Sequence, residues 1–156
     1  MKLLAVIFPL LVLSCDALAG GCPAAPAQIE KVIRQHIVTL RATEYCEARR
    51  VKTENGITVA IYTAEGACTA INPRAKPGTC SNNWVRYMVA LSGQQITPPV
   101  KVGGKGGLSD TGVKISDGII EVIGLTVGPA DSMCCPSVPE TKIFKISPSG
   151  LSEVRP

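Results

Sequence analysis

Hydrophobic residues between Ala27 and Leu40 recur with the period of an α-helix. Apolar side chains fall at the i, i+3, i+4 and i+8 positions of one face, and mostly charged and amide side chains fill the opposite face. The apolar positions are Ile29, Val32, Ile33, Ile37 and Leu40. Because a helix of about 14 residues is marginal by itself in water, this stripe predicts a helix that docks on another element, which we expect to be a sheet.

From Thr43 onward the hydrophobic pattern changes to a period of two, which is typical of β-strands. Two hairpins are predicted, because Asn55-Gly56 and Asp117-Gly118 suit the two positive-φ positions of a type I′ turn. The strand-like arms cover residues 43–53 and 57–68 around the first turn, and residues 112–116 and 119–127 around the second. The last of these arms alternates only in part, so we expect it to be buried on both faces.

Other runs complete the predicted sheet. The most strand-like is Trp84 to Leu91, which is rich in aromatic and β-branched residues. Pro98-Pro99 leave only a short strand from Val100 to Val102, which suits a sheet edge. Two last strands are expected at residues 141–147 and 151–154. Since no helices alternate with the strands, the fold class is α+β: one N-terminal helix packed on a predominantly antiparallel β-sheet of six or seven strands, stapled by disulfides.

The first 19 residues have the pattern of a secretory signal peptide. One lysine precedes a short apolar run, and Ala17-Leu18-Ala19 provides the small residues of a cleavage site. The run is shorter than the roughly 20 residues that span a bilayer, so no membrane span is expected. The alternative is that Val12-Leu13-Ser14-Cys15 is a lipobox, which would place a lipid anchor at Cys15. We expect residues 20–156 to form a single exported domain.

Cysteine usage indicates an oxidising compartment. Seven cysteines occur, and one of them, Cys15, lies in the leader. The six in the exported part are Cys22, Cys46, Cys68, Cys80, Cys134 and Cys135. An even number in a small exported chain predicts a disulfide framework, although six cysteines allow 15 connectivities.

Spacing favours one pair of cysteines. A bridge between Cys68 and Cys80 would close a single loop and stabilise the fold by about 3 kcal/mol. Cys134 and Cys135 are adjacent, and a bond between neighbours forms a strained ring. Each is therefore expected to reach a different distant partner, with Cys22 and Cys46 as the natural candidates.

Residues Gly128 to Pro136 read Gly-Pro-x-Asp-x-x-Cys-Cys-Pro. Through this motif, the region from Trp84 to about Val154 resembles a group of small exported bacterial proteins, often lipoproteins, whose role is not established. The resemblance implies export and a similar fold, and it implies no activity. Members of the group often carry an acidic segment suited to calcium; this chain has Glu54-Asn55-Gly56 instead, so no metal is expected.

No catalytic constellation is visible in the sequence. His36 is the only histidine; it lies beside the apolar stripe of the helix, and no Gly-x-Ser-x-Gly turn accompanies it, so we expect a packing or surface role. The glycines from Gly103 to Gly107 flank Lys105 but lack the Ser/Thr and the following helix of a phosphate loop. We expect a solvated or partner-binding loop there, and no cofactor.

These observations favour a non-enzymatic binding or interaction module, periplasmic or secreted, of which an inhibitor or immunity-type protein is one form. Its polar loops would contact an unidentified protein partner in the cell envelope. The candidate contact residues are Lys76, Lys105, Asp131, Ser132 and Met133. The formal net charge of +4 is spread out and gives no polybasic block for nucleic acid.

Two other functions stay open. One is an exported thiol-redox or metal-binding protein that uses Cys134 and Cys135, although redox enzymes usually separate their cysteines by two residues. The other is a hydrolase of unrecognised type.

Overall fold

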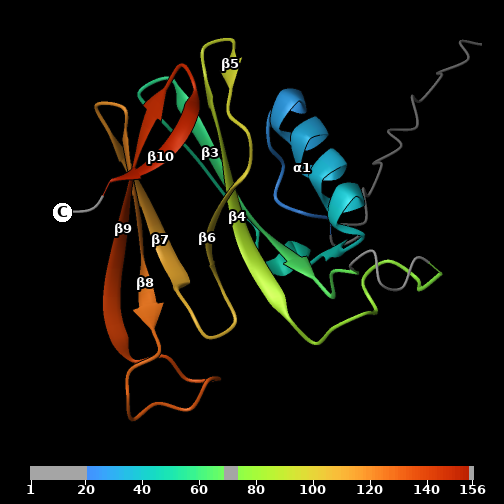
Figure 1. Cartoon of the computed structure of the whole chain (residues 1–156). Helices are drawn as coiled ribbons and strands as arrows, with labels where there is room; N and C mark the ends of the chain where they lie inside the picture. Colours follow the sequence, from blue (N-terminus) through green and yellow to red (C-terminus); the bar gives the residue numbers. More distant parts are fainter. Residues whose placement is uncertain (1–20, 69–73, 155–156) are drawn as a thin grey trace, which may run out of the picture.

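The computed structural model describes residues 21–68 and 74–154, which fold into three layers (Figure 1). Helix α1 covers one face of a six-stranded sheet, and a four-stranded sheet packs on the other face. The α+β class is confirmed, with ten strands in two sheets where the sequence predicted six or seven in one. The expected signal peptide and Cys15 lie outside the described residues.

Helix α1 (Ala27–Leu40) has the bounds that its hydrophobic period predicts. Ile29 and Ile33 from its apolar stripe are fully buried against the six-stranded sheet. Their buried partners on that sheet are Ala60, Tyr62, Val89 and Leu91. The stripe therefore docks on a sheet, as expected.

The six-stranded sheet, which we call sheet A, has two long central strands. All of its strand pairs are antiparallel: β3 pairs with β1 and β2 on one side and with β4 on the other, and β4 also pairs with β5 and β6. Its strands are β1 (Thr43–Glu44), β2 (Arg50–Glu54), β3 (Ile57–Glu65), β4 (Trp84–Ser92), β5 (Gln95–Ile96) and β6 (Val100–Gly104), with a 3₁₀ turn, η1 (Cys46–Ala48), between β1 and β2. The expected edge position of Val100 to Val102 is confirmed.

The second sheet, sheet B, is an antiparallel meander in the order β10-β9-β8-β7. Its strands are β7 (Ser109–Ser116), β8 (Ile119–Thr126), β9 (Val138–Ser147) and β10 (Gly150–Val154). Both predicted hairpin turns are present, because φ is positive at Asn55 and Gly56 and again at Asp117 and Gly118. The chain passes from sheet A to sheet B through the β6–β7 turn.

The main hydrophobic core lies between the two sheets. Sheet A contributes Ile57, Val59, Ile61, Met88, Ala90 and Val102, and sheet B contributes Leu108 (just before β7), Ile115, Ile120, Val122 and Phe144. Because sheet A is the middle layer, β3 is buried along both faces. The expectation that the strand after Asp117-Gly118 is buried on both faces is wrong: β8 alternates between buried and half-buried positions, since only one face of sheet B meets the core.

Two disulfides cross-link the part of the chain around α1 and sheet A. Cys22 is bonded to Cys46, which joins the segment before α1 to η1, with the Cα atoms 4.4 Å apart. Cys68 is bonded to Cys80, with the Cα atoms 4.9 Å apart. The predicted Cys68–Cys80 pair is confirmed, and the disulfide-stapled fold with it.

Candidate functional site

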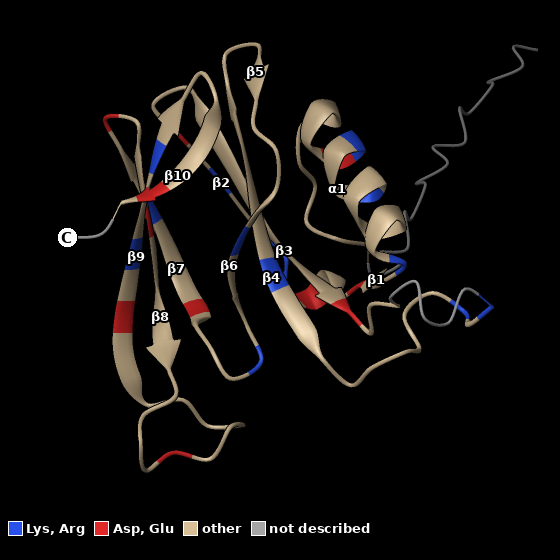
Figure 2. Ribbon diagram, viewed as in Figure 1, with Lys and Arg blue, Asp and Glu red and all other residues tan. Residues whose placement is uncertain are grey.

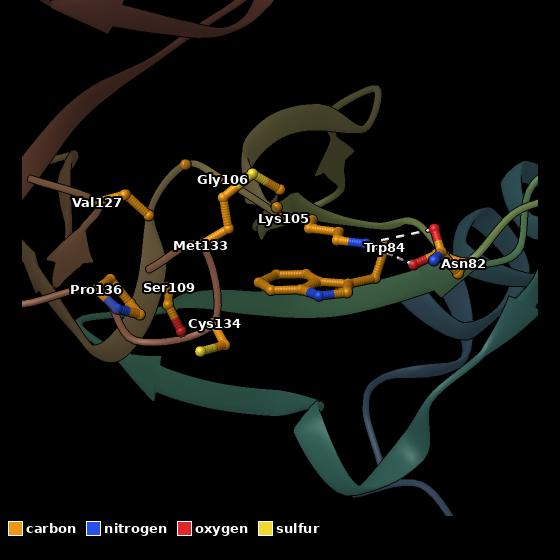
Figure 3. Close-up of a pocket in the computed structure, with 11 residues that line it drawn as sticks. Asn82, Trp84, Lys105, Gly106, Ser109, Val127, Met133, Cys134 and Pro136 are labelled. Atoms are coloured by element: carbon orange, nitrogen blue, oxygen red, sulfur yellow. Dashed lines mark hydrogen bonds between the residues drawn. The ribbon is translucent and has the colours of Figure 1, made fainter. Parts of the chain in front are cut away.

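A groove opens between the two sheets, at the end of the molecule where the β6–β7 turn and the β8–β9 loop lie (Figures 1 and 3). We call it the inter-sheet groove, and its volume is about 530 Å³. It is lined by Asn82, Trp84, Gly104, Lys105, Gly106, Gly107, Ser109, Val127, Met133, Cys134 and Pro136. The lining of the groove thus includes an aromatic ring, a thioether, a thiol and one ammonium group.

The close approach of the β6–β7 turn to Trp84 shapes this groove. At Gly104 φ is +149°, and a Cβ atom would lie 2.9 Å from the carbonyl oxygen of Trp84. That same oxygen accepts a hydrogen bond from the amide of Lys105 at 3.0 Å. The Lys105 side chain extends toward Asn82, where Nζ donates to the carbonyl and Oδ1 oxygens at 3.3 Å (Figure 3). A side chain at position 104 would therefore push the β6–β7 turn away from the backbone of Trp84.

A second pocket of about 220 Å³ shares Trp84 and Ser109 with the groove. Its wall carries an ion pair between Arg86 and Asp110, whose side chains are only 7% and 2% exposed. Asp110 Oδ2 accepts from Arg86 Nη2 at 2.7 Å and from Arg50 Nε at 3.0 Å. Arg86 Nε lies 2.6 Å from Asp110 Oδ1, although this pair is not aligned as a hydrogen bond.

The same guanidinium is held inside sheet A as well. Arg86 Nη1 donates to Thr63 Oγ1 at 2.8 Å and to the carbonyl oxygen of Ala48 at 2.9 Å. Because Asp110 belongs to β7 and Arg86 to β4, the ion pair fastens the two sheets together beneath the groove. Because both side chains are almost fully buried, we assign the pair a structural role.

Residues 128–137, which we call the dithiol loop, form the opposite wall of the groove. Its shape is set by Asp131, whose Oδ2 accepts from the amides of Gly128 and Ser137 at 2.8 and 2.9 Å. The hydroxyl of Ser137 donates to Asp131 Oδ1 at 2.8 Å. These hydrogen bonds, that from Gly128 first, lower the pKa of Asp131 below its usual value. The carboxylate of Asp131 therefore ties the start of the loop at Gly128 to its end at Ser137.

Cys134 and Cys135 are exposed free thiols in this loop, with their Sγ atoms 2.8 Å apart. The expectation that each bonds to a distant cysteine is wrong. Cys22 and Cys46 are already joined to each other, and the dithiol loop leaves sheet B, the layer farther from α1. The hydrogen bond with Cys134 raises the pKa of the Cys135 thiol.

The structure brings together only some of the residues chosen from the sequence. Lys105 and Met133 line the groove, and Met133 is 61% exposed. Asp131 and Ser132 belong to the dithiol loop, where Asp131 holds the loop and the carbonyl oxygen of Ser132 accepts from the Cys135 amide at 2.9 Å. Lys76 does not line the groove; its segment is bonded to the end of α1 through Gly78.

His36 lies between α1 and sheet A, away from the groove. Its Nδ1 atom is 2.6 Å from the hydroxyl of Tyr62, and its ring meets that of Tyr87 edge-on at 4.5 Å. Burial lowers the pKa of His36. This contact set matches the expected packing role.

Trp84, Arg86 and Asp110 were not singled out as site residues by the sequence. One signal was available: Arg86 interrupts the otherwise apolar run from Trp84 to Leu91, and a charge inside a central strand needs a buried partner. The partner itself, Asp110, could not be identified without knowing that β7 faces β4.

Charge and metal ligands add little to this picture. Figure 2 shows the Lys and Arg residues interspersed with acidic residues over several elements. Within the described residues, one group of three or more metal-ligating side chains lies close enough to share an ion, namely Cys22, Glu44 and Cys46, but both of its sulfurs are in a disulfide. Among those residues, no helix has the length and apolar character that crossing a membrane requires.

The chain matches no protein-family model, and comparison with curated proteins and with solved structures finds no significant similarity. The resemblance to exported proteins with the Gly-Pro-x-Asp-x-x-Cys-Cys-Pro motif therefore stays a prediction.

Proposed function

We propose that this chain is a non-enzymatic binding module of the cell envelope, periplasmic or secreted, that docks a protein partner in the inter-sheet groove. An inhibitor or immunity-type protein is one form of such a module. The observation that carries the proposal is the groove itself, which combines half-buried Trp84 and exposed Met133 with the ammonium of Lys105.

The residues of the groove match the anchors that protein interfaces use. Tryptophan and methionine are enriched at the buried centre of interfaces, and truncating a central tryptophan commonly costs the largest share of affinity. Lys105 at the rim suits a carboxylate of the partner, which would steer association more than it would strengthen the complex. The expected partner segment is therefore a loop with an apolar or aromatic side chain beside an acidic one.

The absence of an obvious reaction centre supports a binding role. Among the residues that line the groove, Ser109, Lys105 and Cys134 have side chains that can act as nucleophiles, and no histidine or carboxylate lines the groove to act as a base. The two disulfides agree with export into an oxidising compartment.

Site-specific photo-crosslinking in the native cells tests the proposal. A benzophenone amino acid in place of Lys105 should give a defined protein adduct, whereas the same amino acid in place of exposed Lys31 on α1 should not. Trp84→Ala should abolish the adduct formed from position 105. Equal adducts from positions 105 and 31, or an adduct that survives Trp84→Ala, would refute docking in the groove.

The captured partner then allows a quantitative test with purified proteins. By isothermal titration calorimetry, Trp84→Ala should weaken the complex by roughly 30-fold, the effect of losing a central anchor. Lys31→Ala serves as the matched surface control and should leave the dissociation constant unchanged. If both variants bind equally well, the partner docks elsewhere.

A further inference from the structure

The cysteines among the described residues are in two different states. Two pairs of cysteines are bonded, and Cys134 and Cys135 are left as free, exposed thiols. They stabilise nothing by cross-linking, yet the loop that carries them is tightly built. A pair of thiols that the fold neither buries nor bonds calls for a chemical explanation.

The geometry presents both sulfurs to the same small volume. Their Sγ atoms are 2.8 Å apart, and no disulfide joins them. Both side chains are exposed, so they can rotate apart to span one ion without disturbing the core. Cys134 also lines the inter-sheet groove, whereas Cys135 does not, so an ion held by the pair would lie at the groove's rim.

The backbone of the dithiol loop is already ordered around the two thiols. The three donors on Asp131 join both ends of the loop, and the Cys135 amide donates to the Ser132 carbonyl oxygen at 2.9 Å. Because these bonds are formed before any ligand arrives, binding does not have to order the backbone between the two thiols. Asp131 is thus a positioning residue and touches neither sulfur in this role.

We propose that Cys134 and Cys135 form a chelating site for a soft, thiophilic ion that accepts two thiolates on one side, as trivalent arsenic does. Soft thiolate ligands select soft ions, and adjacent residues can offer their sulfurs only at a narrow angle. Trivalent arsenic is pyramidal, so two of its bonds point to the same side and suit that angle. The proposal does not rest on the protein partner proposed above, although Cys134 lines the groove in which that partner would dock.

The reaction with the probe phenylarsine oxide balances without an oxidant. The two S–H bonds and the bond between arsenic and oxygen break, and two As–S bonds form. Both protons leave with the oxygen as one water molecule. Arsenic stays trivalent throughout. The product is a cyclic dithioarsenite that bridges Cys134 and Cys135.

Intact-mass titration of the full exported chain, purified anaerobically without reductant, tests the site. One phenylarsine should bind per chain with loss of one water. The monothiol variants Cys134→Ser and Cys135→Ser should each bind roughly 100-fold more weakly or worse, because a single thiolate cannot close the chelate. Iodoacetamide should still label one thiol in each variant, which shows that the remaining sulfur is accessible.

Matched controls separate chelation from other sulfur chemistry. Met133→Leu should change the affinity by less than about threefold, since Figure 3 shows the Met133 and Cys134 side chains leaving the loop in different directions. The bridges Cys22–Cys46 and Cys68–Cys80 should stay intact in peptide maps. Equal binding by the monothiol variants would overturn the proposal, and so would native protein in which Cys134 and Cys135 are already bonded to each other.

Discussion

The two sides of this molecule use cysteine in opposite ways. Around α1 and sheet A, two disulfides fix segments that have little regular pairing: the stretch before α1 and η1, and the loop that follows β3. In the dithiol loop between β8 and β9 of sheet B, both cysteines are exposed thiols. The disulfides thus occur where the pairing between strands is short.

Sheet B needs no such cross-links because its strands hold one another. Strands β7 to β9 have eight to ten residues each and pair along nearly their whole length. The sheet is fastened to sheet A by the apolar core and by the buried pair of Arg86 and Asp110. Disulfides are thus found only on the α1 side, where Arg49 also pairs with Glu30 and Glu44, whereas sheet B is held by non-covalent contacts alone among the described residues. This difference leads to distinct predictions.

The largest effect is expected at the ionic junction between the sheets. Asp110→Leu should lower the free energy of unfolding by about 3–5 kcal/mol, because it leaves the buried Arg86 guanidinium without its counter-charge. Urea unfolding followed by Trp84 fluorescence measures this loss. The double variant Arg86→Met with Asp110→Leu should recover most of it, since an apolar pair removes both buried charges. A double variant no more stable than Asp110→Leu would contradict the assignment.

The second-largest loss of stability is expected from removing a disulfide on the side of α1 and sheet A. Replacing Cys68 and Cys80 together by alanine should cost about 3 kcal/mol, the chain-entropy value for a loop of this length. Replacing Cys134 and Cys135 together by serine should leave the urea midpoint unchanged, because both thiols are exposed and unbonded. The two double variants are matched in the number of sulfurs removed. A similar loss of stability in both double variants would contradict the proposed difference between the two sides of the molecule.

The elements that the sequence predicted correctly are those governed by neighbours in the chain. The period of α1, the turns at Asn55-Gly56 and Asp117-Gly118, and the Cys68–Cys80 loop all depend on residues within about a dozen positions. The burial of β8 on both faces was predicted wrongly, because it depends on which sheet is the middle layer. No local pattern encodes that order.

The candidate site was predictable only in part for the same reason. The motif from Gly128 to Pro136 marked the dithiol loop, and Lys105 was chosen from its glycine-rich surroundings. The groove itself depends on β4, the β6–β7 turn and the dithiol loop meeting in space. The free state of Cys134 and Cys135 followed from a pairing elsewhere, between Cys22 and Cys46.

A smaller, pH-dependent effect is expected under α1. Burial lowers the pKa of His36 in the folded state, so the unfolded chain binds the proton more readily. The stabilisation is present above the ordinary histidine pKa of about 6.5 and is lost as the pH falls through the lower folded value. Urea midpoints between pH 7 and pH 5 should therefore fall more steeply in the native protein than in His36→Gln. Parallel pH profiles would show that the imidazole beside Tyr62 makes no linked contribution.

The smallest effect on overall stability, and the most local one, is expected in the dithiol loop. Asp131→Ala removes the acceptor for the amides of Gly128 and Ser137, so hydrogen exchange at those amides should accelerate while the urea midpoint stays the same. The affinity for phenylarsine oxide should fall several-fold, because the loop must then be ordered on binding. Asp117→Asn, in the turn between β7 and β8, is the matched control and should alter neither readout. Unchanged exchange at Gly128 and Ser137 in Asp131→Ala would mean that the loop holds its shape without the carboxylate, and the preorganisation of the two thiols would need another cause.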